Sequence, residues 1–396
     1  MTTATATVPA RRSRPRLTLA LDGERTGTFT ALLVLVVVLV FLGLVMVLSA
    51  SSVASLETTS STWSYAVRQG LWALLGTAGL IVALRSDRRS WRRWCRVGLL
   101  AVVGLLVLVL VPGVGISANG ARRWLGAGSV QLQPSELAKI AVILFCADLL
   151  ARRSTEVHDP RRTLWPVVGV LGGVSMLVLL QPNLGTTLVI GVIVLAMLHG
   201  AGVRMVPLAG LGALAVVAAG LLVWFEPYRR RRLFATFDPW ANKSDSGYQL
   251  IQAGVGLSDG GLIGLGLGQS KAKYGYLPYA HTDFIFAIIG EELGLLGALS
   301  VVLLFVALAF LGVRAATRAA DRFSALVATG ITTWLVAQAF LNIAVVLGLV
   351  PNTGVPLPFI SYGGTSLLVT MVAVGMLLNI ARHPRSAGPR PAAADR

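Results

Sequence analysis

Long apolar runs dominate this sequence, and they decide what the chain can fold into. Residues 29–50 form the clearest example, an apolar stretch interrupted only by single small or hydroxylated side chains. About 20 apolar residues in an α-helix cross a bilayer, and hydrocarbon forces the backbone to satisfy its hydrogen bonds within the helix. With 55% hydrophobic residues, 13% charged residues and a mean hydropathy of +0.75, the chain has the composition of a protein that crosses the membrane many times.

The runs predict an all-α, polytopic membrane protein with ten transmembrane helices. A long extracytoplasmic loop, residues 226–282, separates the seventh helix from the eighth. The first run is too long for a cleaved signal peptide, and a second span follows it directly. The expected spans are 29–50, 66–84, 97–113, 135–151, 164–180, 184–200, 205–225, 284–313, 323–349 and 364–381.

Basic residues predict the orientation and the limits of the domain. With both termini in the cytoplasm, most of the 34 basic residues fall in cytoplasmic segments, as the positive-inside rule requires. The Arg229–Arg232 run is the exception, because it falls in the long outer loop. We predict one transmembrane domain, 25–382, between two disordered tails, 1–24 and 383–396, which are rich in Ala, Pro and Arg. The net charge of +17 follows from this topology and from attraction to anionic membrane lipid, and it requires no nucleic acid.

Glycine, proline and polar residues gather in four segments on the expected outer side. These segments are 117–139, 179–186, 226–282 and 349–366. Irregular backbone near membrane depth is tolerated only where it is buried in protein or lines a water-filled cavity. Four such segments on one side therefore predict a single cavity that opens to the outside.

Charged residues inside the expected spans are the first candidates for function, because an intramembrane charge is costly unless it is paired or hydrated. Glu136 and Lys139 are three residues apart, so a helix places them on one face. The pair is either a structural staple of the fourth helix or a part of the site. Glu291 and Glu292, about two helical turns into the eighth span, allow the same two interpretations.

A short polar motif, His281, Thr282 and Asp283, stands directly before the eighth span. The N-terminus of a helix favours an anion, so a helix cap at Thr282 or Asp283 is the simplest explanation of the motif by itself. The alternative is that Asp283 performs chemistry at the level of the outer headgroups.

Several long motifs in this chain resemble the SEDS family (shape, elongation, division and sporulation), whose members are membrane glycosyltransferases that polymerise peptidoglycan. They extend over nearly the whole chain and follow one another in the family's order. Two of them are more similar to the FtsW, or division, branch than to the RodA, or elongation, branch. The motifs are "GLVMVLSAS" (43–51), "GARRWL" (120–125), "QPSELAK" (133–139), "YLPYAHTDFIFAIIGEELG" (276–294) and "PNTGVPLPFISYGGTS" (351–366).

The resemblance implies a substrate, a reaction and a set of partners. The substrate would be lipid II, an undecaprenyl-pyrophosphate-linked disaccharide pentapeptide, which an inverting transfer adds to a nascent β-1,4 glycan strand. The work would take place at the outer face of the bacterial cytoplasmic membrane, at the division septum, together with a class B penicillin-binding protein and other division proteins. Asp283, in the "HTDF" motif, would be the catalytic residue, and Trp124, Glu136 and Lys139 fall on positions implicated in activity.

An inverting transfer from a pyrophosphate needs one carboxylate as general base and positive charge around the phosphates, but no second carboxylic acid. The resemblance favours Arg68 and Arg123 as phosphate contacts, and His281 joins the candidates for substrate binding. The Arg229–Arg232 run could instead form an interfacial helix whose side chains reach lipid headgroups. Trp124 could stack on a sugar or belong to the aromatic belt at the membrane surface. The basic candidates on the outer side are Arg68, Arg122, Arg123, Lys139, Lys271, Lys273 and Arg229–Arg232.

Two positions depart from the family pattern. Asn183 stands where the family often has an aspartate, so this position keeps its hydrogen bonding but loses the charge; we retain it as a candidate for substrate binding. Tyr279 stands where Glu or Asn is more usual. No His/Cys cluster suggests a metal such as zinc, and the sequence leaves open a divalent cation, Mg²⁺ or Mn²⁺, that bridges Asp283 and the pyrophosphate.

Two other functions compete with the enzyme. A lipid II flippase would need a polar path through the whole membrane, whereas Asp148 is the one obvious buried charge in the expected cytoplasmic half. A non-catalytic scaffold of the division machinery would use the outer loops and helices only to dock a partner. Because the polar groups gather on the outer side, the sequence favours catalysis.

Overall fold

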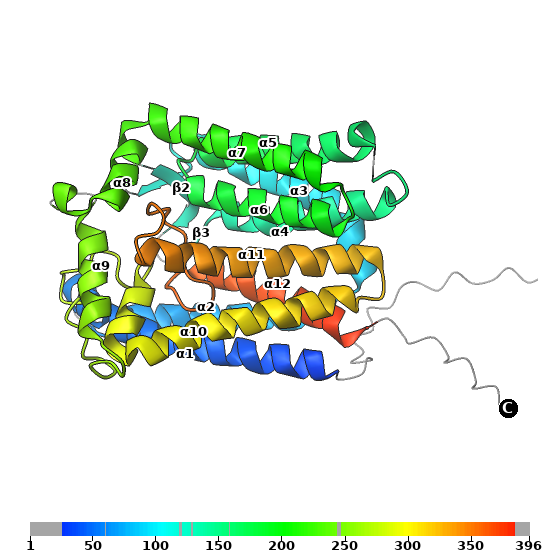
Figure 1. The fold of residues 1–396 in the computed structure, drawn as a ribbon. Coiled ribbons are helices and arrows are strands. Elements are labelled where there is room, and N and C mark those ends of the chain that lie inside the picture. The colour runs from blue at the N-terminus through cyan, green and yellow to red at the C-terminus, as the bar shows by residue number, and fades with distance from the viewer. Residues whose placement is uncertain are drawn as a thin grey trace, which may run out of the picture.

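The computed structural model describes residues 26–59, 61–118, 121–127, 130–157, 159–243 and 247–384. Helices dominate these residues, and the predicted all-α membrane class is confirmed (Figure 1). The predicted tails lie outside the described residues, apart from residues 383 and 384. The helices at the expected spans are α1 (Gly27–Thr59), α2 (Ser64–Arg85), α3 (Arg88–Leu110), α4 (Pro134–Arg152), α5 (Trp165–Leu179), α6 (Leu184–Gly200), α7 (Met205–Phe225), α10 (Ile285–Thr317), α11 (Arg322–Val346) and α12 (Gly364–Arg382).

Eight of the described helices are long and apolar enough to cross a membrane, with α5 counted together with the π-helical turn Pro160–Leu164 that precedes it. The helices α4 and α6 do not reach that standard, because α4 carries the charges of Glu136, Lys139 and Asp148, and α6 has 17 residues. The many-times-crossing architecture is confirmed, and the count of ten transmembrane helices stays a prediction.

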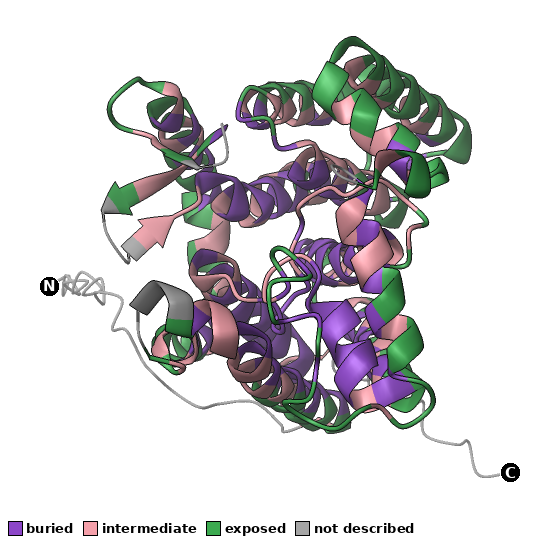
Figure 2. Ribbon diagram, turned by 90° about the vertical axis from the view of Figure 1, so that its left-hand side faces the viewer, coloured by how far each residue is buried: buried purple, intermediate pink, exposed green. Residues whose placement is uncertain are grey.

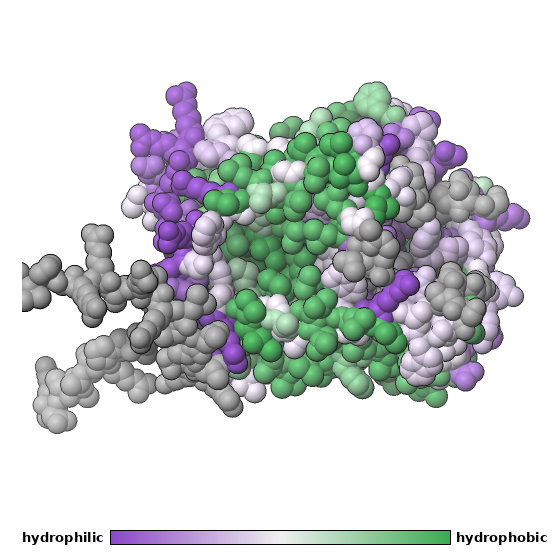
Figure 3. Space-filling view, turned by 180° about the vertical axis from the view of Figure 1, so that it is seen from behind, coloured by the Kyte–Doolittle hydropathy of each residue, from purple (hydrophilic) through white to green (hydrophobic). Residues whose placement is uncertain are grey.

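The helices run side by side, and the two ends of the bundle differ (Figure 1). The loop end carries the β-strands, the segment between α7 and α10, and the segment 347–363 between α11 and α12. The tail end carries residues 26 and 384. An apolar surface band separates a strongly polar tail end from a mixed polar surface at the loop end (Figure 3). This is the pattern expected of a protein with water at both ends and lipid in the middle.

Two parts of the loop end have regular structure, of which the sequence suggested only a helix at the Arg229–Arg232 run. A small antiparallel sheet of β1 (Ile116–Ala118), β2 (Ala121–Ala127) and β3 (Val130–Leu132) joins α3 to α4, with Trp124 opposite Ile116. The long predicted loop contains α8 (Pro227–Phe237), a short 3₁₀ turn (Trp240–Asn242) and α9 (Tyr248–Asp259). These elements place side chains of distant segments at fixed positions over the helix ends.

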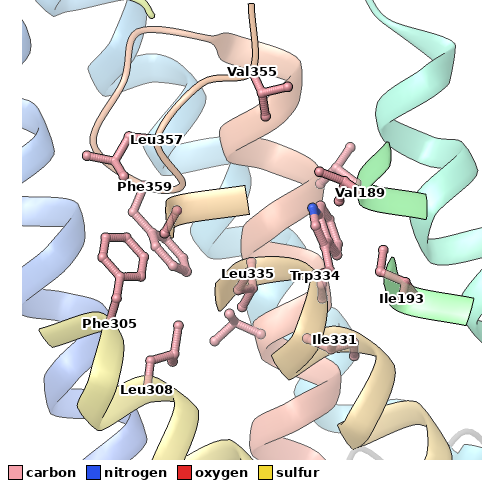
Figure 4. Packing of buried hydrophobic residues seen from close by; sticks show 14 of the residues in the cluster. Val189, Ile193, Phe305, Leu308, Ile331, Trp334, Leu335, Val355, Leu357 and Phe359 are labelled. Carbon is pink, nitrogen blue, oxygen red and sulfur yellow. The ribbon is translucent and has the colours of Figure 1, made fainter. Parts of the chain in front are cut away.

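The core lies around α4, α6, α11 and α12, which hold many buried side chains, while α7 at the periphery buries only Leu208 (Figure 2). Trp334 of α11 is fully buried and faces Ile193 of α6 (Figure 4). Val355, Leu357 and Phe359 enter the same core from the segment 347–363 (Figure 4). Packing of these side chains therefore fixes the segment against the helices.

Two glycines allow close approach of backbone at the loop end. A Cβ at Gly43 of α1 would lie 2.2 Å from the carbonyl oxygen of Phe359, so only glycine fits there. Gly294 has a φ of 68° and breaks the helical geometry of α10. Across this break, the glycine-rich segment 261–266 exchanges backbone hydrogen bonds of 2.9–3.2 Å with residues 291–296. The segment is thereby fixed against α10.

Candidate active site

The four segments that the sequence placed on one side meet at the loop end, as predicted. Nε of Arg123 in β2 donates a 2.9 Å hydrogen bond to the carbonyl of Gln181. Arg232 of α8 donates a 3.1 Å bond to the carbonyl of Asn352. Thr365 Oγ1 donates a 2.6 Å bond to the carbonyl of Gln131. These contacts join segments that are more than fifty residues apart into one unit.

Asp283 lies in this unit, directly before α10, and its backbone is firmly held. Asn342 Nδ2 of α11 donates to the carbonyl of Asp283 at 2.8 Å and to the carbonyl of Val355 at 2.9 Å. Ser361 Oγ donates a 2.7 Å bond to the carbonyl of Thr282. The half-buried Asp283 carboxylate forms no hydrogen bond or ion pair with any of the described residues. The site thus fixes the residue and leaves its acidic group available.

The simplest explanation of the motif, a helix cap at Thr282 or Asp283, is wrong. The residue at the cap position of α10 is Phe284, and no side chain caps this helix end. Thr282 Oγ1 instead donates a 3.1 Å hydrogen bond to the carbonyl of Tyr279. The carboxylate of Asp283 therefore has no structural task in starting the helix.

Two arginines from distant elements provide the positive field at Asp283. Arg232 of α8 and Arg123 of β2 both stabilise the ionised carboxylate and so lower its pKa. Burial opposes them and is the larger effect, so the pKa of Asp283 is raised to about 6. Gly354 lies beside the group, since a Cβ there would be 3.7 Å from Oδ2. A carboxyl group with this pKa is mostly ionised at pH 7 yet basic enough to accept a proton.

Arg123 has two tasks in this arrangement. Its Nε and Nη2 atoms donate to the carbonyls of Gln181 and Pro182, the latter at 2.6 Å, so part of the guanidinium ties β2 to the α5–α6 turn. The remaining N–H groups are free of these bonds and can meet an anion. Trp124 beside it is half-buried in β2, and neither of its two interpretations is decided by the contacts.

The Arg229–Arg232 run forms the first half of α8, and its members diverge. Arg232 is half-buried, lies 4.6 Å over the ring of Tyr228 and reaches Asn352. Arg230 and Arg231 are exposed, with Arg230 over the ring of Trp224 at 6.0 Å. Arg229 is also half-buried and lies close enough to Arg123 to lower the pKa of Arg123, so Arg229 and Arg232 face the site. Arg230 and Arg231 have the exposure expected of an interfacial helix.

His281 belongs to an aromatic cluster rather than to the carboxylate. Its ring centroid lies 5.1 Å from that of Tyr65 and 5.7 Å from that of Tyr362. Burial lowers the pKa of His281 below its ordinary value, which favours the neutral ring. Arg68 of α2 is exposed and lies close enough to the Tyr362 hydroxyl to oppose the rise in its pKa that burial causes. Arg68 thus stands at the edge of the site, where an anion could reach it.

Asn183 has a structural explanation. Its Oδ1 atom accepts a 3.2 Å hydrogen bond from the backbone N–H of Thr186, so it caps α6. Its Nδ2 atom donates a 3.4 Å bond to Ser135 Oγ at the start of α4. An uncharged amide can both accept and donate here, which a carboxylate could not. The departure from the family pattern therefore suits a residue that positions two helix ends.

Glu136 and Lys139 form a buried network in the first turns of α4, near the loop end. Lys139 Nζ lies 2.8 Å from Glu136 Oε1 and 2.8 Å from Gln338 Oε1, and 4.6 Å over the ring of Trp334. Gln338 Nε2 donates a 2.9 Å bond to the carbonyl of Pro356. The network ties α4 and α11 to the segment that carries Gly354. Both charged side chains are almost fully buried, so they hold the elements around the site in place and are not exposed to a ligand.

Glu291 and Glu292 are also buried, and they anchor the chain that leads to Asp283. Glu291 accepts hydrogen bonds from the backbone N–H of Lys271 at 2.7 Å and from Ser270 Oγ. Glu292 accepts from Ser49 Oγ of α1 at 2.6 and 2.8 Å and lies 3.7 Å from Lys273 Nζ. These contacts favour the structural interpretation of both glutamates.

The two lysines proposed as substrate contacts lie apart. Lys273 is buried, with its Nζ atom near Glu292 and bonded to the carbonyl of Gly268. Lys271 is exposed and lies 3.4 Å from Asp259 of α9. Lys273 is therefore engaged by Glu292 and the Gly268 carbonyl, whereas Lys271 is exposed to solvent.

Two residues of the site, Asn342 and Gln338, were not predicted from the sequence, and Arg232 was predicted only as a member of the Arg229–Arg232 run. Asn342 and Gln338 are polar side chains inside an apolar helix, and such residues are functional candidates in a membrane protein. That signal was present in "AQAFLN" (337–342). Arg232 could not be told apart from its three neighbours, because only the start and direction of α8 decide which arginine faces Asp283.

Other sites of interest are limited in the described part of the chain. No group of three or more His, Cys, Asp or Glu side chains within it could hold a metal ion. Two cavities lie away from Asp283: one of about 50 Å³ at the tail end beside Arg314, and an open apolar groove of about 760 Å³ along α1 and α10. The predicted cavity at the loop end therefore stays a prediction.

Comparison with protein families places this architecture among known proteins. The family model of FtsW, RodA and SpoVE, described as cell cycle proteins, matches residues 30–386. A probable peptidoglycan glycosyltransferase FtsW of Geobacter metallireducens is 43% identical over 334 residues, which are 84% of this chain and 89% of that protein. Stage V sporulation protein E of Bacillus subtilis is 40% identical over 339 residues, 86% of this chain and 93% of that protein.

Solved structures show the same fold. A chain of a peptidoglycan synthase complex, described for its coordination of polymerization and crosslinking, superposes with a TM-score of 0.73 and 29% identity, covering 92% of this chain and 98% of that one. The rod shape determining protein RodA of Thermus thermophilus gives a TM-score of 0.67 at 28% identity, covering 91% of this chain and 97% of that one.

Proposed function

Because this chain belongs to the FtsW/RodA/SpoVE family of cell cycle proteins, it is a peptidoglycan glycosyltransferase, and we propose that Asp283 is the general base of its reaction. The observation that carries this proposal is the Asp283 carboxylate itself. It is held where four loop segments meet, it is free of structural partners among the described residues, and Arg123 and Arg232 act on it from two sides. A partly buried acid without a structural task is a strong candidate for catalysis.

The reaction that fits this site is an inverting transfer with lipid II as substrate. Asp283 accepts the proton of the acceptor GlcNAc hydroxyl while the oxygen attacks the anomeric carbon of the donor MurNAc. The bond between that carbon and the pyrophosphate breaks, and undecaprenyl pyrophosphate leaves with the electron pair. One carboxylate is enough, because the leaving group departs as an anion without needing a proton.

The departing diphosphate needs positive charge, and the loop end supplies it. Arg232 and the N–H groups of Arg123 that remain unbonded are nearest to Asp283, and Arg68 stands beyond the aromatic cluster. The buried Lys139 and Lys273 support these groups without reaching the substrate. Arginine suits this task because its planar fork can hold a phosphate through two hydrogen bonds.

The location of the site fits a lipid-linked substrate. The polyprenyl tail stays in the bilayer, so the reacting sugars meet near headgroup level, where α10 begins. We place the loop end outside the cytoplasmic membrane and both termini in the cytoplasm, in accord with the positive-inside rule. As in the related synthase complex, a partner is expected, and a class B penicillin-binding protein at the division septum is our proposal.

The competing functions predict different products from the same substrate. Asp148, the buried charge that a flippase path could use, lies 2.7 Å from Arg92 and 2.8 Å from Arg152, so it has a structural role at the tail end. Purified protein, with and without its partner, should convert lipid II into glycan polymer. Movement of lipid II across vesicles without polymer would favour the flippase, and neither product would favour the scaffold.

The two arginines predict a pH signature. The polymerisation rate should fall as the pH drops through about 6, because protonated Asp283 cannot accept a proton. Arg232 lowers this pKa, so Arg232→Gln should move the acid limb of the rate profile to higher pH. Arg230→Gln, on the exposed side of α8, should leave the limb in place. An identical limb in wild type and Arg232→Gln would show that this arginine does not act on the base.

A further inference from the structure

Three tyrosines precede Asp283, and all of them point away from the protein. Tyr274, Tyr276 and Tyr279 are 62%, 58% and 48% exposed. Leu277, which lies between Tyr276 and Tyr279, and Ala280, which follows Tyr279, are instead buried in the core. The segment therefore has buried side chains that hold it in place and exposed phenol rings, of which the ring centroid of Tyr274 lies 5.9 Å from Lys273 Nζ.

The tyrosines stand on a fixed scaffold. Glu291 holds the start of the segment through the backbone N–H of Lys271 at 2.7 Å. Asn342 and Ser361 hold its end through the carbonyls of Asp283 and Thr282. A ring on such a segment can bind a ligand with little further loss of conformational freedom.

Tyr279 carries backbone strain as well as an exposed ring. Its φ of 60° lies in the left-handed region, which glycine and asparagine occupy more readily than tyrosine does. Its carbonyl accepts hydrogen bonds from the backbone N–H of Thr282 at 3.0 Å and of Phe284 at 3.5 Å, so it forms the turn that presents Asp283. An aromatic residue at a strained turn beside the reactive carboxylate indicates that the ring itself is used.

We propose that Tyr274, Tyr276 and Tyr279 form a carbohydrate-binding strip on which sugar rings of the glycan stack, with Tyr279 next to the reacting sugar. A tyrosine offers a flat apolar face and a hydroxyl, which match the C–H face and the hydroxyl groups of a sugar. A polymer of linked sugars can occupy several rings at once. This inference rests on the proposed function, and it assigns residues that bind the glycan without touching the pyrophosphate.

Variants of Tyr279 test the strip, because strain and stacking can be separated. Tyr279→Asn removes the ring but suits the left-handed backbone, so its thermal stability should equal or exceed that of wild type. Its KM for lipid II should nevertheless rise about three- to tenfold, the range that an aromatic contact supplies, with a smaller change in kcat. Tyr279→Phe keeps the ring and should stay within about twofold of wild type.

Replacing Tyr274 or Tyr276 should shorten the glycan product more than it slows formation of the first glycosidic bond. Tyr274→Ser and Tyr276→Ser should give shorter glycan strands on gels, and soluble glycan free of lipid should inhibit them less than it inhibits wild type. Phe237→Ser, an exposed aromatic on α8, is the control. A wild-type KM in Tyr279→Asn, or a loss in Phe237→Ser equal to the loss in the tyrosine variants, would contradict the proposed strip. The tyrosines would then belong to the aromatic belt at the membrane surface. Absence of polymer from wild type would count against the proposed function instead.

Discussion

Replacing Asp283 by asparagine is expected to lower the initial rate of glycan polymerisation by about 10²- to 10⁴-fold, the share that a general base contributes. The amide keeps the size of the side chain but cannot accept the proton of a sugar hydroxyl. Folding should be unaffected, because the carboxylate makes no hydrogen bond or ion pair within the described residues, while its backbone carbonyl keeps the bond from Asn342. The measurement is polymer formed from lipid II by purified protein with its partner.

The matched control for this variant is Asp259→Asn. Asp259 is also an acidic residue of the loop end, but it is exposed, and its one ion pair among the described residues is with Lys271, at 3.4 Å. An exposed pair of this kind contributes little to stability, so the control should polymerise at the wild-type rate. Activity of Asp283→Asn above about one tenth of wild type would rule out Asp283 as the base.

Breaking the buried pair of α4 should have the largest effect on stability. Lys139→Met would leave the Glu136 carboxylate buried without its cation, and such a change costs about 3–5 kcal/mol. The double variant Glu136→Gln/Lys139→Met removes both charges, and we expect it to recover most of that loss. The measurement is the fraction of protein that stays monodisperse in detergent after heating.

The double variant also decides between the two interpretations of the pair. Glu136 Oε2 is buried with no hydrogen-bond partner among the described residues, which is an unusual state for a carboxylate oxygen. If the pair is only a staple, the double variant should regain polymerisation together with stability. A double variant that is as unstable as Lys139→Met would contradict our account of the network.

The helices were predictable because hydrocarbon leaves the backbone few choices. Each expected span coincides with a helix, and the ends agree within a few residues except at the end of α1, Thr59, and at the start of α3, Arg88, which both lie nine residues outside the expected spans. The small sheet around Trp124 was not predictable, since its strands are short and their pairing depends on the turns between them. The helical geometry of α10 breaks at Gly294, where the segment 261–266 forms backbone hydrogen bonds with residues 291–296. The hydrophobic periodicity of the sequence cannot identify such a partner segment.

The site was predictable in its residue types and only partly in its geometry. The prediction that polar segments gather on one side correctly placed Asp283, Arg123 and the long loop near one another. The sequence could not distinguish basic residues that face the site from those that serve the fold, as Lys273 does in its contact with Glu292. The sequence also predicted that Thr282 or Asp283 caps α10, whereas the Thr282 hydroxyl donates its hydrogen bond to the carbonyl of Tyr279. Such assignments depend on side-chain direction in irregular backbone, which sequence spacing does not determine.

The central claim is that the Asp283 carboxylate removes a proton from the acceptor sugar. The most direct test is the initial rate of polymerisation measured side by side for wild type and Asp283→Asn, between about pH 5 and pH 8. We expect the wild-type rate to rise with pH and level off above about 6, and the variant to stay near background at every pH. A variant that follows the wild-type curve, or a wild-type rate that is the same at every pH in this range, would contradict the account.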